Sequence, residues 1–134
     1  MKIFISQKVS GMDRDSLKEE TKKITETLGN NGHKVTSVID YPKEFANSSV
    51  GERLRNYAFK RMDEADTILA IIRGDDRSEG MLMEIGHILD SDKKIILAIQ
   101  KEIKNTYLRQ IANQTLEFDG FDDLIKQLKN LKWN

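Results

Sequence analysis

The sequence predicts an α/β protein built on a five-stranded, doubly wound parallel sheet, and three features support this fold class. Short runs rich in β-branched residues alternate with longer segments of helical periodicity along the whole chain. Residues 67 to 72 and 94 to 99 are almost continuously aliphatic, as expected of central strands that are covered on both faces. Crossovers between parallel strands are right-handed, which leaves few topologies for such an alternation.

We expect the flavodoxin-like strand order 2-1-3-4-5. The expected strands are residues 2 to 6, 35 to 39, 67 to 72, 94 to 99 and 115 to 118. The expected helices are residues 13 to 28, 50 to 64, 78 to 89, and a last one that Asp119 caps and that ends near Leu131. Residues 101 to 113 fit either a short helix or a loop.

Local signals mark the ends of the first elements. Leu17, Ile24 and Leu28 share one face at helical spacing, and the Gly-Asn-Asn-Gly segment that follows ends that helix. The single proline, Pro42, and a polar stretch separate the second strand from the second helix. Asp66 closes the connection into the third strand.

The second half repeats the alternation. The helix after the third strand carries Glu84 within an apolar run, and the fourth strand is as apolar as the third. The last helix is predicted from apolar residues at helical spacing, which are Phe121, Leu124, Ile125, Leu128 and Leu131.

Length and composition limit the classes of function. With 134 residues we expect one domain, residues 1 to 134. The 22 basic and 22 acidic residues balance, so no global field attracts a nucleic-acid polymer or an acidic membrane surface. The chain has no cysteine, and we find neither a signal peptide nor a membrane span. We therefore expect a soluble cytoplasmic protein that binds a small molecule or another protein.

The topology predicts where a ligand binds. In a sheet of this order the crevice lies beyond the carboxyl ends of strands one and three. We therefore expect two loops to converge there. The first contains Ser6, Gln7, Lys8, Ser10 and Gly11, and the second contains Arg73, Gly74, Asp75, Asp76, Ser78, Gly80 and Glu84.

The helix of residues 78 to 89 holds the most informative side chain, Glu84. On a helical wheel it lies at the margin of an apolar face formed by Met81, Leu82, Ile85, Ile88 and Leu89. Gly80 lies one turn earlier, so a ligand over the glycine could contact the carboxylate. The alternative is that Glu84 is only a partly exposed residue beside the core.

The start of this helix is a candidate anion site. Ser78 stands at the cap position, the free amides behind it point towards the strand ends, and Arg73 and Arg77 are close in sequence. The alternative is that Ser78 only caps the helix.

Several other kinds of site are excluded by pattern. The chain has neither a Walker-type lysine motif nor a dinucleotide glycine fingerprint. A receiver domain is excluded because Arg73 stands where a phosphoacceptor aspartate is required. His87 lies three residues after Glu84 without partner ligands, and His33 lies in a turn, so we expect surface histidines and neither a metal nor a cofactor.

The combined pattern resembles the nucleoside 2-deoxyribosyltransferase-like superfamily, which includes 2'-deoxynucleoside 5'-monophosphate N-glycosidases and uncharacterised phage and bacterial relatives. The resemblance covers residues 1 to about 100. It rests on the opening Met-Lys-Ile-Phe-Ile-Ser with Gly11 downstream, on Ala65-Asp66 before an aliphatic strand, and on Ser78-x-Gly80-x-x-x-Glu84-x-Gly86.

The resemblance implies that Glu84 is the nucleophile that attacks the anomeric carbon of a deoxyribose as the base leaves. Ser78 stands where the monophosphate N-glycosidases have the serine that contacts the 5'-phosphate, whereas the transferases have an aspartate. The chain also departs from the transferases at Phe4, where they tend to have tyrosine, and at Arg73, where they have an aspartate. Asp75 or Asp76 could supply the missing acid.

The sequence leaves three functions open. The first is an enzyme that hydrolyses or transfers at an N-glycosidic bond. The second is a non-catalytic nucleotide-binding module of the same fold, and the third is an interaction protein with a vestigial cleft. The resemblance also implies a homodimer or higher oligomer. The expected surface combines the outer side of the Glu84 helix with Tyr57, Phe59 and Met62, although these three could instead pack on the sheet.

Overall fold

The computed structural model describes residues 1 to 76 and 78 to 133, and its sheet has the predicted order. All neighbouring strands pair in parallel in the order β2-β1-β3-β4-β5. The strands are β1 (Lys2–Gln7), β2 (Lys34–Ser37), β3 (Thr67–Ile72), β4 (Lys94–Gln100) and β5 (Gln114–Phe118). The predicted fold class is confirmed.

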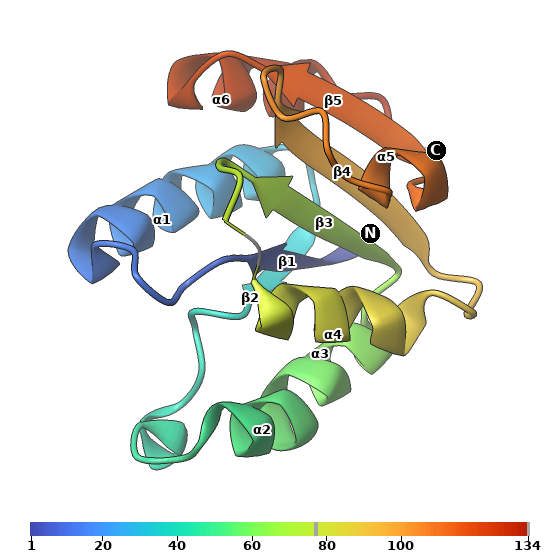
Figure 1. Ribbon diagram of the computed structural model, residues 1–134. Coiled ribbons are helices and arrows are strands. Elements are labelled where there is room, and N and C mark those ends of the chain that lie inside the picture. Colours follow the sequence, from blue (N-terminus) through green and yellow to red (C-terminus); the bar gives the residue numbers. More distant parts are fainter. Residues whose placement is uncertain (77, 134) are drawn as a thin grey trace.

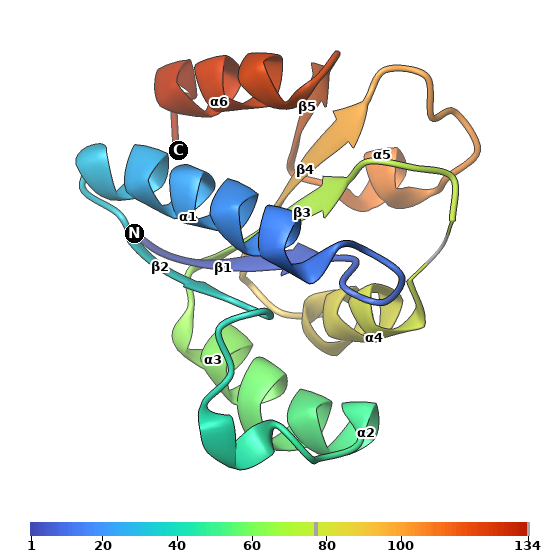
Figure 2. The same cartoon turned by 90° about the vertical axis from the view of Figure 1, so that its left-hand side faces the viewer.

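Helices cover both faces of the sheet. They are α1 (Arg14–Asn30), α2 (Val50–Arg53), η2 (Leu54–Ala58), α3 (Phe59–Glu64), α4 (Glu79–Ile88), α5 (Leu108–Ile111) and α6 (Phe121–Asn130), with a short 3-10 turn η1 (Lys43–Phe45). Figure 1 shows α1 and α6 on one face and α2, α3 and α4 on the other. Figure 2 shows how the sheet separates these two layers.

Two apolar cores result, one on each face. Phe4, Met62 and Ile85 belong to the core beneath α2 to α4. Ile5, Leu28 and Leu124 belong to the core beneath α1 and α6. Strands β3 and β4 contribute to both cores through alternate residues, which explains why their sequences are almost continuously apolar.

The expected helix of residues 50 to 64 is continuous but not uniform. Its middle turn, η2, is π-helical, which the sequence pattern did not predict. A π-helical turn changes the direction of the side chains around it and often occurs at functional sites. Here Leu54, Tyr57 and Ala58 are buried, and the Tyr57 hydroxyl donates to the Ser37 carbonyl at 3.1 Å. This bond ties the helix to the end of β2.

Two predicted boundaries were wrong. Strand β2 ends at Ser37 rather than residue 39, because the Ser37 hydroxyl donates to the Asp40 carboxylate at 2.9 Å and the chain turns there. Helix α6 follows Gly120, and Asp119 does not cap it. The Asp119 carboxylate instead pairs with Lys101 at 3.1 Å. The ambiguous segment of residues 101 to 113 contains the short helix α5.

The predicted orientation of α4 was also wrong. Leu82 and Leu89 are 41% and 51% exposed, whereas Glu84 is only 1% exposed. The buried stripe consists of Met81, Glu84, Ile85 and Ile88. These residues have i, i+3, i+4 and i+7 spacing, so the side of α4 that packs inward includes the carboxylate.

Candidate active site

Glu84 is held at the place where α4 meets the end of β1. Strand β1 lies beside β3, with Ser6 opposite Ala70, and α4 packs against β1. The fully buried Ser6 hydroxyl donates to Glu84 Oε1 at 2.6 Å. Within residues 1 to 76 and 78 to 133, Glu84 Oε2 is buried and has no hydrogen-bond partner. One carboxylate oxygen is therefore fixed, and the other is left without a partner.

Burial controls the ionisation of this carboxylate. It raises the pKa of Glu84 to about 7, and the hydrogen bond from Ser6 opposes the rise. Glu84 can therefore be either neutral or ionised near neutral pH. Strong perturbation of a carboxyl group in a cleft is typical of functional sites.

A cavity of about 410 Å³ lies over Glu84, and we call it the Glu84 cavity. Helix α4 contributes Ser78, Glu79, Gly80, Met81 and Glu84 to its lining. The end of β1 contributes Gln7 and Lys8, and the opposite segments contribute Arg14, Tyr41, Arg53, Leu54 and Tyr57. The cavity has the size and the mixed apolar and polar lining of a small-molecule site.

The start of α4 forms one end of this cavity. Ser78 caps the helix as predicted, because its hydroxyl accepts the Met81 amide at 3.2 Å. A methyl group added at Gly80 would meet only the Ser78 hydroxyl, at 4.0 Å. The protein's own packing therefore does not require glycine at this position, and the missing side chain leaves space above the helix.

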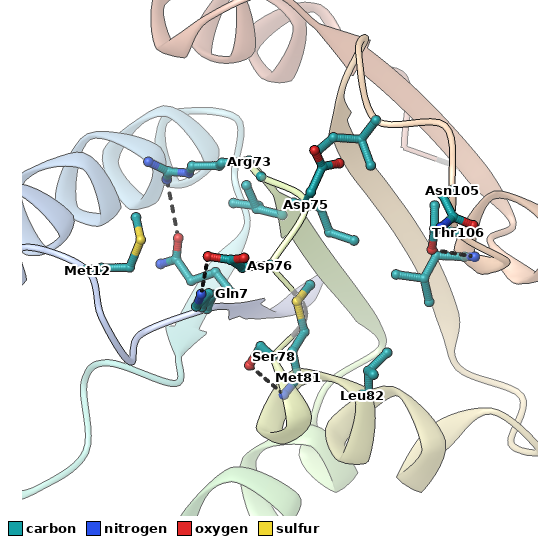
Figure 3. A pocket seen from close by; sticks show the side chains of 16 residues that line it. Gln7, Met12, Arg73, Asp75, Asp76, Ser78, Met81, Leu82, Asn105 and Thr106 are labelled. Atoms are coloured by element: carbon teal, nitrogen blue, oxygen red, sulfur yellow. Dashed lines mark hydrogen bonds and ion pairs between the residues drawn. The ribbon is translucent and has the colours of Figure 1, made fainter.

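A second cavity of about 490 Å³ lies beside the first, between the end of β3 and the segment that follows β4, and we call it the Ile103 cavity. Its lining includes Ile103 and Gly74. It also includes Arg73, Asp75, Asp76 and Asn105, which are labelled in Figure 3. The two cavities share four lining residues, Gln7, Lys8, Ser78 and Met81. Asp75 and Asp76 thus line the neighbouring cavity and not the one that contains Glu84.

Two predicted binding residues take part in internal contacts. Arg73 forms an ion pair with Glu20. It also donates to the Gln7 side-chain oxygen at 3.3 Å, as Figure 3 shows. The Gln7 amide nitrogen donates to Thr21 at 2.7 Å. These bonds hold the loop after β3 against β1 and α1. Gly11 has a φ of 77° and forms the turn after β1, and it lines neither cavity.

Asp66 and His87, which the sequence analysis also considered, interact with other residues of the protein. The Asp66 carboxylate accepts the Lys2 amide at 2.8 Å. His87 pairs with Asp63 at 2.8 Å and stacks on Phe59 with ring centroids 4.2 Å apart. Arg77 lies outside the described residues. In the described part of the chain, no cluster of three or more residues could hold a metal ion, and no helix has the length and apolarity to cross a membrane.

Sequence reasoning missed much of the lining of the Glu84 cavity, and three of the missed residues, Arg14, Tyr41 and Arg53, are polar or charged. They come from the start of α1, from the loop after β2 and from the end of α2. No motif or common spacing links them. Only the folded chain brings them together.

Comparison with solved structures shows what this fold resembles. A CMP N-glycosidase from Clostridium botulinum matches with a TM-score of 0.70 and 17% identity, over 98% of this chain and 100% of that one. A 2-deoxyribosyltransferase from Bacillus psychrosaccharolyticus matches with a TM-score of 0.68 and 19% identity, over 99% and 93%. A conserved protein from Enterococcus faecalis V583 matches with a TM-score of 0.66 and 10% identity, over 97% and 98%.

These matches confirm the predicted resemblance to the nucleoside 2-deoxyribosyltransferase-like superfamily at the level of the fold. No protein-family model and no curated protein sequence matches the chain. At such low identity the roles of individual residues depend on the site geometry.

Proposed function

We propose that this protein cleaves the N-glycosidic bond of a 2'-deoxynucleotide or nucleoside, by hydrolysis or by transfer to another base, with Glu84 as the nucleophile. One observation carries the proposal: the buried Glu84 carboxylate lines a ligand-sized cavity with one oxygen held by Ser6 and the other unpaired. The similarity of the fold to an N-glycosidase and a deoxyribosyltransferase supports the same chemistry.

The proposed reaction has two displacements. The Glu84 carboxylate attacks the anomeric carbon, a carbon–oxygen bond forms, and the carbon–nitrogen bond breaks with its electron pair leaving on the base. Water or a second base then attacks the same carbon and releases Glu84. The Ser6 hydroxyl fixes the orientation of the carboxylate during both steps.

The experiment that tests this proposal is incubation of the protein with deoxynucleosides and their 5'-monophosphates, followed by chromatography of the released base. Release from at least one substrate, absent in the Glu84→Gln variant, is the expected result. Binding without release would favour a non-catalytic nucleotide-binding module, and neither binding nor release would favour an interaction protein.

We further propose that Ser78 and the first amides of α4 bind the 5'-phosphate, since Ser78 and Gly80 line the cavity beside Glu84. Hydrogen bonds to a charged group contribute roughly 1.5 to 3 kcal/mol, so monophosphates should bind about 10- to 100-fold more tightly than nucleosides. Ser78→Ala should narrow that difference in calorimetry.

Ser49→Ala is the matched control, because Ser49 caps α2 in the same way, accepting the Glu52 amide at 3.2 Å, and lines neither cavity. Both variants should lose stability by about 1 kcal/mol. Equal affinity of the wild-type protein for nucleosides and monophosphates would show that Ser78 caps the helix and does not bind the phosphate.

The oligomeric state is a further proposal, with a different surface from the one the sequence predicted. Tyr57 and Met62 are 7% and 0% exposed, so they pack on the sheet and are not available to a partner. The exposed apolar residues of α4 and its end are Leu82, Met83 and Leu89, at 41%, 55% and 51%. We propose that this outer side of α4 forms a homodimer contact.

Light scattering at micromolar concentration should therefore give about twice the monomer mass, and the double variant Met83→Glu, Leu89→Glu should give the monomer mass. Tyr107→Glu is the control, since Tyr107 is the most exposed large apolar residue, at 80%, and lies at the start of α5. A monomeric wild-type protein would contradict the dimer.

A further inference from the structure

The lining of the Glu84 cavity that does not come from α4 includes two guanidinium groups against one tyrosine ring. The Cζ atoms of Arg14 and Arg53 lie 5.3 Å and 5.1 Å from the centroid of Tyr41. Arg14 also donates to the Tyr41 hydroxyl at 2.8 Å, and Arg53 donates to the Ser48 carbonyl at 2.6 Å. We call Arg14, Tyr41 and Arg53 the cationic wall.

In the described part of the chain, neither arginine of the cationic wall takes part in an ion pair. In residues 1 to 76 and 78 to 133, no carboxylate lies within ion-pair distance of Arg14 or Arg53, whereas Arg61, Arg73 and Arg109 each pair with a glutamate. The carboxylates that line the cavity, Glu79 and Glu84, both belong to α4. Each guanidinium group has five N–H donors and no acceptor. Both arginines of the cationic wall therefore keep N–H donors that can bind a ligand.

We propose that Arg14 and Arg53 bind the carbonyl edge of the nucleobase and stabilise the negative charge that develops on it as it leaves. This inference rests on the proposed function. We place the phosphate and the sugar on α4, along Ser78, Gly80 and Glu84. The base then extends towards the part of the lining that does not come from α4, which includes the cationic wall. The favoured substrates are then deoxynucleotides whose base has a carbonyl group at C6 of a purine or at C4 of a pyrimidine, namely hypoxanthine, guanine, uracil and thymine.

The donor-only character of guanidinium groups sets this preference. A carbonyl oxygen of hypoxanthine accepts a hydrogen bond from arginine, whereas the exocyclic amino group of adenine cannot, so adenine would leave a donor facing a donor. Arginine recognises the acceptor edge of guanine in nucleic acids for the same reason.

The cationic wall also supplies a group that assists departure of the base. When the bond from the anomeric carbon breaks, its electron pair moves onto the base nitrogen and is delocalised to the carbonyl oxygens. The two guanidinium groups keep their protons and stabilise the resulting anion, which then takes a proton from water. Asp75 and Asp76, in the neighbouring cavity, are not required in this scheme.

The test compares deoxyinosine and deoxyadenosine 5'-monophosphates, which differ at the 6-position of the base and in the proton on N1. The wild-type protein should have at least a tenfold higher kcat/KM for the inosine substrate. Arg14→Met and Arg53→Met should bring the ratio towards one, mainly by lowering kcat for deoxyinosine monophosphate, because the interaction strengthens as charge develops. Arg55→Met is the matched control, since Arg55 is exposed on η2 and lines neither cavity.

The outcomes separate this inference from the proposed function. Base release with equal rates for both substrates, or a ratio that survives both arginine substitutions, would overturn the inference and leave the proposed function standing. If no deoxynucleotide releases base, the proposed function fails. Calorimetry with free hypoxanthine and adenine then still tests whether the cationic wall binds the carbonyl edge of a base. Preference for hypoxanthine that Arg53→Met abolishes would support it, and equal binding would overturn it.

If the cationic wall binds the phosphate group instead of the base, the arginine variants should behave differently. Calorimetry with inorganic pyrophosphate would then show weaker binding in the arginine variants, while the ratio of inosine to adenosine substrates would not change. That combination would overturn the assignment of the wall to the base. Thermal unfolding of each variant checks that the fold is retained.

Discussion

Replacing Glu84 with glutamine is expected to abolish base release and, at the same time, to stabilise the protein above neutral pH. Glutamine keeps the shape of the side chain and can still accept the hydrogen bond from Ser6. It cannot form the covalent intermediate, so kcat should fall at least about a thousandfold, as loss of a nucleophile does in other enzymes. Chromatography of the released base measures this loss.

The gain in stability follows from the raised pKa of Glu84. The folded-state pKa is about 7, above the ordinary value of 4.5. The folded protein therefore binds more protons than the unfolded chain between these two values, and its stability falls as the pH rises from 4.5 to 7. The pKa difference corresponds to at most about 3 kcal/mol, and the neutral glutamine avoids this cost.

At pH 8 the melting temperature of Glu84→Gln should exceed that of the wild-type protein by about 5 to 10 °C, and the two should nearly coincide at pH 4. Differential scanning calorimetry at both pH values measures the difference. Glu84→Ala is the less informative substitution, because removal of a buried side chain opens a void and leaves Ser6 without its acceptor. A variant no more stable than the wild-type protein at pH 8 would contradict the raised pKa.

The fold was predictable because its signals are local. Each central strand is buried on both faces, so β3 and β4 read as continuous apolar runs. Ser78 and Glu84 could also be identified from the sequence. A helix cap and a carboxylate within one apolar helix lie within seven residues of each other, so their pattern is local. The strand order then predicted that the end of β1 lies beside this helix, and the hydrogen bond between Ser6 and Glu84 is consistent with that prediction.

The remaining features depend on tertiary packing. A helical wheel cannot say whether Glu84 borders the core or lies in it, because Leu82 and Leu89 extend the apolar surface of α4 on its exposed side. The cationic wall combines residues from three separate segments of the chain. The π-helical turn η2 contributes Leu54 and Tyr57 to the same cavity. Neither has a local sequence signal.

Replacing Ser6 with alanine is expected to move the pH dependence of the reaction to higher pH. In the wild-type protein kcat/KM should rise as Glu84 ionises, with a midpoint near its pKa of about 7. The Ser6 hydroxyl stabilises the ionised form, so its removal raises the pKa of Glu84 further. A hydrogen bond to a charged group contributes roughly 1.5 to 3 kcal/mol, which corresponds to a shift of about 1 to 2 pH units.

At pH 7, where about half of the wild-type Glu84 is ionised, the Ser6→Ala variant should therefore be about 5- to 50-fold less active than the wild-type protein, with much of the difference recovered near pH 9. Ser6→Thr keeps the hydroxyl and serves as the control, and its midpoint should stay close to that of the wild-type protein. The readout is the pH profile of kcat/KM, because a residue that only supports packing would lower activity equally at every pH. An unshifted midpoint in Ser6→Ala would show that the hydroxyl does not control the ionisation of the nucleophile.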